Sequence, residues 1–419
     1  MGLTMIGVSI LITLWLYFQA KLAVPGTGLW QGLAQLTGLL GLIGLSWTYI
    51  LALRHRILER LFGGLDKAYK IHHILGAGAF IFLVNHPLFL IIDSLPANTL
   101  STYLVPGVSL AYTLGILALY LLFILLSLTL YVDLPYWFWK KTHEWMGLVV
   151  ILGALHGILV VSDVSRFLPL KVWVLFWSLM AVSVFIYKRY LYYLLLPRNN
   201  YILERITQED EAVVAELVPT AQTKPIYFEP GQYAFFEIER PGRKRDEHPF
   251  SVLDEENGRI KIGLKVIGDF TLSMMRLSVG SKVTVRGPYG TFGRVAFRKN
   301  DMVWIAGGIG ITPYASMMKK LTSGQNVLMI HTTSKRAPKI LAGIFEAYSY
   351  LHPNFRWFPY RTSELGRLTA PVIAKYVDSL KNKFFFLCGP EMMMKGLERQ
   401  LIGHGVKRKQ IIFEDFGFK

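Results

Sequence analysis

The sequence predicts a membrane-embedded bundle of six helices, followed by a small antiparallel β-barrel and then an α/β domain. Hydrophobic residues make up 53% of the 419 residues, and the mean hydropathy is +0.38, which is typical of a membrane protein. Six apolar segments precede Pro197. After Pro197 the pattern changes to short alternating strands, and from Asp301 to strands that alternate with helices.

The six apolar segments predict a transmembrane domain over residues 1–196. They lie at roughly 4–20, 30–52, 69–92, 108–131, 142–162 and 169–192. Most of them reach the ~20 residues that a helix needs to cross the hydrocarbon core. The first segment could pass for the core of a signal peptide. It lacks a charged region before it and further apolar segments follow, so we interpret it as the first membrane-spanning helix.

Lysine and arginine predict the orientation of the bundle in the membrane. Basic residues gather in the loops after the second, fourth and sixth segments, and the alternate loops have fewer. Because cytoplasmic loops carry the excess of lysine and arginine, both termini and the region after Pro197 are expected in the cytoplasm of a multi-pass membrane protein. These loops explain part of the net charge of +17 without a nucleic-acid partner.

The chain has one cysteine, Cys388. A single cysteine excludes an internal disulfide framework, a cysteine-based zinc site and a cysteine-ligated iron–sulfur cluster. Any redox chemistry in this chain must therefore use other cofactors.

Four histidines lie in the third and fifth apolar segments. They are His72, His86, His143 and His156. Ionisable side chains at membrane depth are costly and usually functional, and imidazole is a common axial ligand of haem iron. The third and fifth helices run in the same direction, so His72 can meet His143 at one depth and the other two can meet at a second depth. The pattern predicts two bis-histidine haem sites, stacked across the membrane.

Two questions stay open for these ligands. His73 lies next to His72 and could replace it. His143 and His156 are 13 residues apart, which on an ideal helix turns one about 140° away from the other. A π-bulge or another distortion of the fifth helix would help to align them. Three glycines of this segment would permit one: Gly147, Gly153 and Gly157.

Three short motifs predict that residues 197–298 form a flavin-binding barrel. The first comprises His248, Pro249, Phe250 and Ser251; the second comprises Lys265, Gly268, Asp269, Phe270 and Thr271; the third runs from Gly287 to Gly290. A serine hydroxyl and backbone amides can bond a flavin ring, on which an aromatic side chain can stack. Gly268 and Thr271 can let the backbone approach a diphosphate. Strands are expected at 227–239, 259–265 and 282–286.

A glycine-rich segment predicts that residues 299–419 form a nucleotide-binding domain. It follows a short strand at 302–305 and contains Gly307, Gly308, Gly310, Thr312 and Pro313. The helix that it opens presents amides and a dipole that favour phosphate, and glycine allows close approach of the nucleotide. The segment is not the G-x-G-x-x-G dinucleotide fingerprint.

The next strand, at 326–331, leads into a turn that contains Ser334, Lys335 and Arg336. Hydroxyl and cationic groups at this place suit the 2′-phosphate of a nucleotide. The turn therefore favours NADPH over NADH, although NADH stays possible.

Two residues near the C-terminus are candidates for the hydride-transfer site. Cys388 ends a buried strand and is followed by Gly389 and Pro390, which we expect beside the nicotinamide. A terminal aromatic ring could cover the flavin and move aside for the nicotinamide. Phe416 is preferred for this role and Phe418 is the alternative, and a packing role stays open for each.

Taken together, these residues resemble the ferric reductase and NADPH oxidase superfamily over almost the whole chain. The paired histidines match its ferric reductase-type haem domain, and the flavin and nucleotide motifs match its ferredoxin–NADP reductase module. The compact size suggests a prokaryotic member, and no EF-hand calcium loop is visible. Some oxidases of the family carry a further histidine one turn after the outer ligand, where this chain has Leu90.

The resemblance implies electron transfer from cytoplasmic NADPH, through FAD and two b-type haems, to an acceptor at the outer face. O2, giving superoxide, is the expected acceptor because no outer-face iron site is visible. A ferric-chelate reductase, or a module that feeds a quinone or a partner protein, are the alternatives. Constitutive turnover is expected because no regulatory domain is visible.

Overall fold

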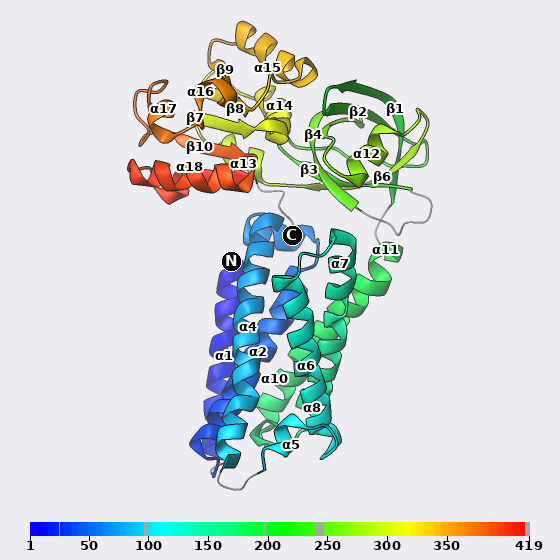
Figure 1. Cartoon of the computed structure of the whole chain (residues 1–419), viewed down its shortest axis with the longest axis vertical. Coiled ribbons are helices and arrows are strands. Elements are labelled where there is room, and N and C mark those ends of the chain that lie inside the picture. Colours follow the sequence, from blue (N-terminus) through cyan, green and yellow to red (C-terminus); the bar gives the residue numbers. More distant parts are fainter. Residues whose placement is uncertain (25, 96–98, 196–197, 240–246, 415–419) are drawn as a thin grey trace. The chain divides into compact units, whose positions relative to one another are not determined.

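The computed structural model describes residues 1–24, 26–95, 99–195, 198–239 and 247–414, and it divides the chain into two compact units, Met1–Leu196 and Pro197–Lys419 (Figure 1). The first unit is helical. Its elements are α1 (Gly2–Ala23), α2 (Leu29–Leu51), α3 (Arg56–Phe62), α4 (Leu65–Ser94), α5 (Ser101–Leu104), α6 (Leu110–Tyr131), α7 (Tyr136–Glu144), α8 (Met146–Leu159), α9 (Asp163–Arg166), α10 (Leu168–Ile186), the π-helix η2 (Tyr187–Leu191) and α11 (Tyr192–Leu195).

Six helices among the described residues are long and apolar enough to cross a membrane, as the sequence predicts. They are Gly2–Ala23, Leu29–Leu51, Leu65–Ser94, Leu110–Tyr131, Phe138–Leu159 and Leu168–Leu191. Small residues let α2 and α4 approach closely, because a Cβ at Gly41 would lie 2.6 Å from Leu83 Cγ and a Cβ at Gly44 would lie 3.1 Å from Ala79 Cβ. This close packing brings the backbone of α2 against the helix that carries His72 and His86.

The fifth membrane-spanning helix is interrupted at Trp145, between α7 and α8. The Trp145 N–H donates to the Thr142 carbonyl over 3.0 Å, and the Leu148 N–H donates to the Trp145 carbonyl over 2.9 Å. Bonds between residues three apart mark a tight turn of the 3₁₀ type. The expected distortion is therefore present, but it is neither a π-bulge nor a bend at a glycine.

The second unit begins with a closed six-stranded barrel whose strand order is β1-β2-β5-β4-β3-β6, with every pairing antiparallel. The strands are β1 (Asn199–Glu209), β2 (Ala212–Pro219), β3 (Tyr233–Ile238), β4 (Glu247–Glu256), β5 (Arg259–Lys265) and β6 (Lys282–Tyr289), and two short helices follow, α12 (Asp269–Met275) and α13 (Phe292–Ala296). Alternate residues of the strands, among them Leu203, Phe236 and Ile262, fill the barrel interior.

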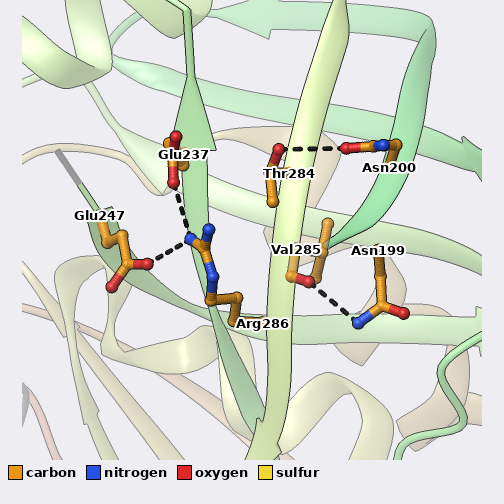
Figure 2. A network of polar contacts seen from close by, with 7 residues as sticks. All are labelled: Asn199, Asn200, Glu237, Glu247, Thr284, Val285 and Arg286. Carbon is orange, nitrogen blue, oxygen red and sulfur yellow. Dashed lines mark hydrogen bonds and ion pairs between the residues drawn. The ribbon is translucent and has the colours of Figure 1, made fainter. Parts of the chain in front are cut away.

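Three charged side chains are buried together in the barrel wall (Figure 2). Glu237 on β3 lies directly opposite Glu247 on β4, and Arg286 on β6 is bound to both carboxylates, with 2.7 Å between its Nη1 and Glu237 Oε2. The three residues are only 4–7% exposed. Two like charges directly opposite would repel across β3 and β4, so the guanidinium stabilises this pairing. Glu247 immediately precedes His248, and Arg286 immediately precedes Gly287, so the cluster holds the strands that carry two predicted flavin motifs.

A five-stranded parallel sheet completes the second unit, with the order β11-β10-β7-β8-β9. Its elements are β7 (Asp301–Gly307), η3 (Gly308–Ile311), α14 (Thr312–Met318), β8 (Asn326–Thr333), α15 (Lys339–Leu351), β9 (Phe355–Arg361), α16 (Thr362–Leu365), α17 (Ala370–Ala374), β10 (Phe384–Cys388), α18 (Glu391–Gly403), η4 (Arg408–Gln410) and β11 (Ile411–Glu414). Helices α14 and α15 cover one face, and α17 and α18 cover the other. Burial on both faces explains why the central strands β7, β8 and β10 are almost continuously apolar.

Candidate functional site

The structure brings the four membrane histidines together as two pairs. His72 on α4 and His143 on α7 have ring centroids 6.3 Å apart, with an angle of 59° between the ring planes. His86 on α4 and His156 on α8 have ring centroids 6.1 Å apart, with an angle of 67°. Both pairs are those that the spacing predicts.

The separation of the rings fits one metal ion between each pair. Two imidazoles bound on opposite sides of a metal, at about 2 Å per bond, have ring centres roughly 6 Å apart. Among the described residues no three histidine, cysteine, aspartate or glutamate side chains form a group that could hold a metal ion by itself. Two protein ligands per site suit haem, because the porphyrin supplies the other four ligands.

Hydrogen bonds at Nδ1 select which ring nitrogen of three of these histidines stays available to a metal. Nδ1 of His72 lies 2.8 Å from the Thr48 carbonyl, Nδ1 of His86 lies 2.7 Å from the Ala34 carbonyl, and Nδ1 of His156 lies 2.8 Å from the Ala111 carbonyl. A carbonyl oxygen only accepts, so each Nδ1 carries the proton and each Nε2 keeps a free lone pair. Metal-binding histidines are held in this way by their second nitrogen.

His143 is held differently. Its Nδ1 is buried and has no hydrogen-bond partner among the described residues. The Trp139 ring stacks on it instead, with centroids 5.3 Å apart and an angle of 20° between the planes. His73, the alternative ligand of the sequence analysis, is an exposed side chain that meets His72 edge-on at 5.7 Å. The carbonyl contact and the pairing with His143 favour His72.

Glycines make room for two of the histidine rings. A Cβ at Gly115 on α6 would lie 2.8 Å from His156 Nδ1, and a Cβ at Gly38 on α2 would lie 3.0 Å from His86 Nδ1. Each glycine is four residues after the residue whose carbonyl accepts the ring proton. The His156 and His86 rings therefore lie directly against the helix backbone, and a side chain at either glycine would displace the ring beside it.

We expect Gly115→Ala to displace the His156 ring and to lower the haem content of the purified protein, with a larger loss than Gly38→Ala. The haem-to-protein ratio from pyridine haemochrome spectra measures both. Gly7→Ala on α1 is the control, because a Cβ there meets nothing within 4 Å. Full haem content in Gly115→Ala would contradict the expectation.

The barrel places the predicted flavin motif on β4. Ser251 Oγ is buried and has no hydrogen-bond partner among the described residues. The rings of His248 and Phe270 stack with centroids 4.0 Å apart, and Phe250 lies 5.9 Å from Phe270. Pro249 lies on β4 between His248 and Phe250, and it is paired with Phe235 on β3.

The second predicted flavin motif forms a turn that Thr271 organises. Its Oγ1 accepts the N–H groups of Ile267 and Gly268, both over 3.1 Å. Asp269 begins α12 and is exposed. Lys265 ends β5 and pairs with Glu211 at 2.9 Å.

The glycine-rich segment and the cysteine motif meet at the carboxyl ends of β7 and β10. A Cβ at Gly310 would lie 2.3 Å from the Cys388 carbonyl oxygen, and a Cβ at Gly307 would lie 2.6 Å from Pro390 Cδ. Gly389 has φ +156° and lies against Gly307. In the sheet, β8 lies on one side of β7 and β10 lies on the other. The strand order therefore reverses between β7 and β10. Ligands of open parallel sheets bind at this point.

The remaining predicted nucleotide residues surround this point or follow the neighbouring strand. Gly308 has φ +54° and begins η3, and Thr312 and Pro313 open α14. Ser334, Lys335 and Arg336 are exposed in the loop after β8. Cys388 is buried at 1% exposure. Phe416 and the alternative Phe418 lie outside the described residues.

His331, which the sequence analysis did not single out, contacts the backbone of the glycine-rich segment. Its Nε2 lies 2.8 Å from the Gly308 carbonyl, and its ring lies 5.5 Å from that of Trp357. Burial lowers the pKa of His331 to about 4, so the ring is neutral near pH 7 and its Nε2–H can donate to the carbonyl. The sequence could have indicated this contact, because His331 lies near the end of β8, and the neighbouring parallel strand β7 leads into the glycines.

Three protein-family models match successive parts of the chain. The ferric reductase like transmembrane component matches residues 37–154, an FAD-binding domain matches 207–293, and an oxidoreductase NAD-binding domain matches 304–399. The chain has a ferric reductase/NADPH oxidase-like architecture. It is a multi-pass membrane oxidoreductase with FAD- and NAD-binding domains, and the predicted fold class is confirmed.

Curated relatives of this ferric reductase-like protein include flavohemoproteins and a subunit of an NADH-quinone reductase. It is 27% identical over 244 residues to a flavohemoprotein of Rhizobium meliloti, covering 52% of this chain and 60% of the relative. It is 26% identical over 192 residues to one of the subunits of the Na⁺-translocating NADH-quinone reductase of Pseudomonas aeruginosa, covering 39% and 46%. The chain thus spans about half the length of these curated relatives. The crystal structure of a flavohemoglobin from Malassezia yamatoensis is similar in fold, with a TM-score of 0.53 and 20% identity over 79% of this chain and 93% of that one.

Proposed function

We propose that this protein moves electrons from cytoplasmic NADPH, through FAD and two b-type haems, to O2 at the outer face of the membrane, where superoxide forms. The observation that carries the proposal is the pairing of His72 with His143 and of His86 with His156, at separations that suit one metal between each pair. When bound, FAD would accept a hydride and the haems would carry single electrons across the membrane.

The residues of the second unit would position the nicotinamide and the flavin. Ser251 Oγ, buried without a hydrogen-bond partner among the described residues, would bond the flavin ring, and the turn at Gly268 would approach the FAD diphosphate. Gly307 and Gly310 let the ends of β7 and β10 pack closely, and Gly308, where a Cβ would meet nothing within 4 Å, would admit the NADPH phosphates near Cys388. Phe416 would cover the flavin. We assign FAD to residues 197–298 and NADPH to residues 299–419.

The membrane histidines would hold the haems and fix their order. His72 and His143 would bind the inner haem, and His86 and His156 the outer one. This order and the cytoplasmic location of the second unit follow from the basic loops after the second, fourth and sixth spans. Carbonyl contacts at three of the four Nδ1 atoms would keep each Nε2 directed at the metal.

Ferric-chelate reduction is a second candidate function. The match of residues 37–154 to a ferric reductase like transmembrane component favours it. Both functions use the same path across the membrane and differ only in the acceptor.

Cytochrome c reduction by the purified protein, with NADPH and FAD in air, tests the proposal and separates the acceptors. We expect reduction that superoxide dismutase abolishes, because electrons then reach cytochrome c only as superoxide. Reduction that persists with the dismutase would place ferric reductase or direct transfer to a partner first. No reduction of cytochrome c or of ferric chelates would contradict the electron path itself.

A further inference from the structure

Two turns of opposite charge approach each other in the second unit, and the basic one is the turn that we assign to the adenosine 2′-phosphate. The basic turn comprises Ser334, Lys335 and Arg336, after β8. The acidic turn comprises Glu209, Asp210 and Glu211, and it joins β1 to β2 of the barrel. The two turns belong to different domains of the second unit, far apart in the sequence.

Glu209 reaches from the barrel to the first turn of α15. Its Oε2 accepts the Ile340 N–H over 2.8 Å, and Ile340 is four residues after Arg336. The amides of Lys339 and Ile340, with smaller contributions from the charges of Lys339 and Arg336, hold the pKa of Glu209 below its usual range. The carboxylate is therefore ionised at neutral pH, close to the basic turn.

Glu211 places a second carboxylate on the same side. Its side chain pairs with Lys265 at 2.9 Å, and its carbonyl accepts the Val266 N–H over 2.8 Å. Lys265, and to a smaller extent Lys335, hold the pKa of Glu211 below its usual range. The carboxylates of Glu209 and Glu211 are thus anchored, and part of their field acts on Lys335 and Arg336.

We propose that the acidic turn, through Glu209 above all, determines how strongly the protein prefers NADPH to NADH. The inference rests on the proposed oxidation of NADPH. A 2′-phosphate brings negative charge toward Lys335 and Arg336, and the nearby carboxylates oppose it. NADH has a neutral 2′-hydroxyl, so the same carboxylates leave its binding almost unchanged. The acidic turn therefore lowers the preference that the basic turn alone would create.

Glu209→Gln tests the proposal because glutamine keeps an oxygen that can accept the Ile340 N–H and removes only the charge. We expect the ratio of kcat/KM for NADPH to that for NADH to rise by roughly threefold to fivefold, the size of one screened surface interaction. Raising the salt concentration should shrink the difference from the wild type. Arg336→Met should move the ratio in the opposite direction.

The matched control is Glu204→Gln, which removes the same charge from the same strand. Glu204 pairs with Arg259 and lies five residues before Glu209, about 17 Å along an extended strand. That exceeds the Debye length of about 10 Å at 0.1 M salt, so the ratio should stay at the wild-type value. An unchanged ratio in Glu209→Gln, or an equal loss with both nucleotides, would overturn the proposal and leave Glu209 as a helix cap only.

A binding measurement separates this inference from the proposed function. Calorimetry with adenosine 2′,5′-bisphosphate and with AMP, which lacks only the 2′-phosphate, reports recognition of that phosphate without any turnover. We expect Glu209→Gln to strengthen binding of the bisphosphate relative to AMP by a similar factor. If the wild type oxidised neither NADPH nor NADH, the proposed function would fail, while this ratio would still decide the role of Glu209.

Discussion

His86→Leu is expected to leave one haem per chain instead of two, and to lower reduction of cytochrome c by more than roughly 100-fold, since even outer-shell changes at metal sites cost about 10- to 100-fold. Leucine cannot bind the metal, and His156 alone would not hold the outer haem with its partner 6.1 Å away removed. Pyridine haemochrome spectra measure the haem content. Anaerobic bleaching of the flavin absorbance by NADPH should continue, because that step needs none of the membrane histidines.

His73→Leu and His72→Leu are the paired controls for ligand identity. We expect His73→Leu to keep both haems and His72→Leu to lose one, because His72 meets both the Thr48 carbonyl and the His143 ring. Two haems in His86→Leu, or loss of haem in His73→Leu with retention in His72→Leu, would contradict the assignment.

Arg286→Met is expected to lower the free energy of unfolding of the barrel by about 3–5 kcal/mol, as is usual when one partner of a buried ion pair is removed. Methionine keeps much of the volume but leaves Glu237 and Glu247 facing each other across β3 and β4 without the guanidinium. FAD occupancy should fall with stability, because the same strands lead into the predicted flavin motifs. Thermal unfolding followed by tryptophan fluorescence, with the FAD content of the purified protein, measures both effects.

Arg294→Met is the matched control for this prediction. Arg294 also binds a carboxylate, that of Glu229, but its side chain is 46% exposed. Exposed ion pairs contribute about 0–1 kcal/mol, so the melting temperature should hardly change. Equal effects of the two substitutions would show that the buried cluster has no special role in stability.

The parts of the fold that could be predicted are those with a strong local signal. A run of about 20 apolar residues has few structural alternatives, so the six spans were predicted to within a few residues at most ends. The pairing of His72 with His143 could be predicted because helices of known direction place residues at known depths. The glycine-rich segment after a buried strand likewise indicated the β7–η3–α14 connection.

The break in the fifth span shows where local reasoning stops. The spacing of His143 and His156 required a distortion, and Gly147 was one candidate place for it. In the structure a Cβ at Gly147 would lie 2.0 Å from the Phe185 ring, so this glycine permits close packing of α8 against α10. The distortion lies two residues earlier, at Trp145, and depends on packing that the segment alone does not reveal.

Contacts that depend on strand order and register could not be predicted. Lys265 was expected at the cofactor, and the pairing of β2 with β5 places it beside Glu211. The Glu209 contact with Ile340, the His331 contact with Gly308 and the Arg286 cluster each join strands or domains. Their positions depend on strand order and register, which a single sequence does not specify.

Three of the four paired histidines are anchored by main-chain oxygens of α2 and α6. Every amino acid carries such an oxygen, so substitutions at Thr48, Ala34 or Ala111 leave the acceptor in place. Ala34 and Thr48 are buried, so a mutational scan would report mainly the effect of side-chain volume at these positions, although each carbonyl holds a ring. The more sensitive positions would be Gly38 and Gly115, whose missing side chains leave room for the His86 and His156 rings. The path of the helix backbone therefore holds Nδ1 of each of the three rings, and conservative changes of the surrounding side chains leave these contacts in place.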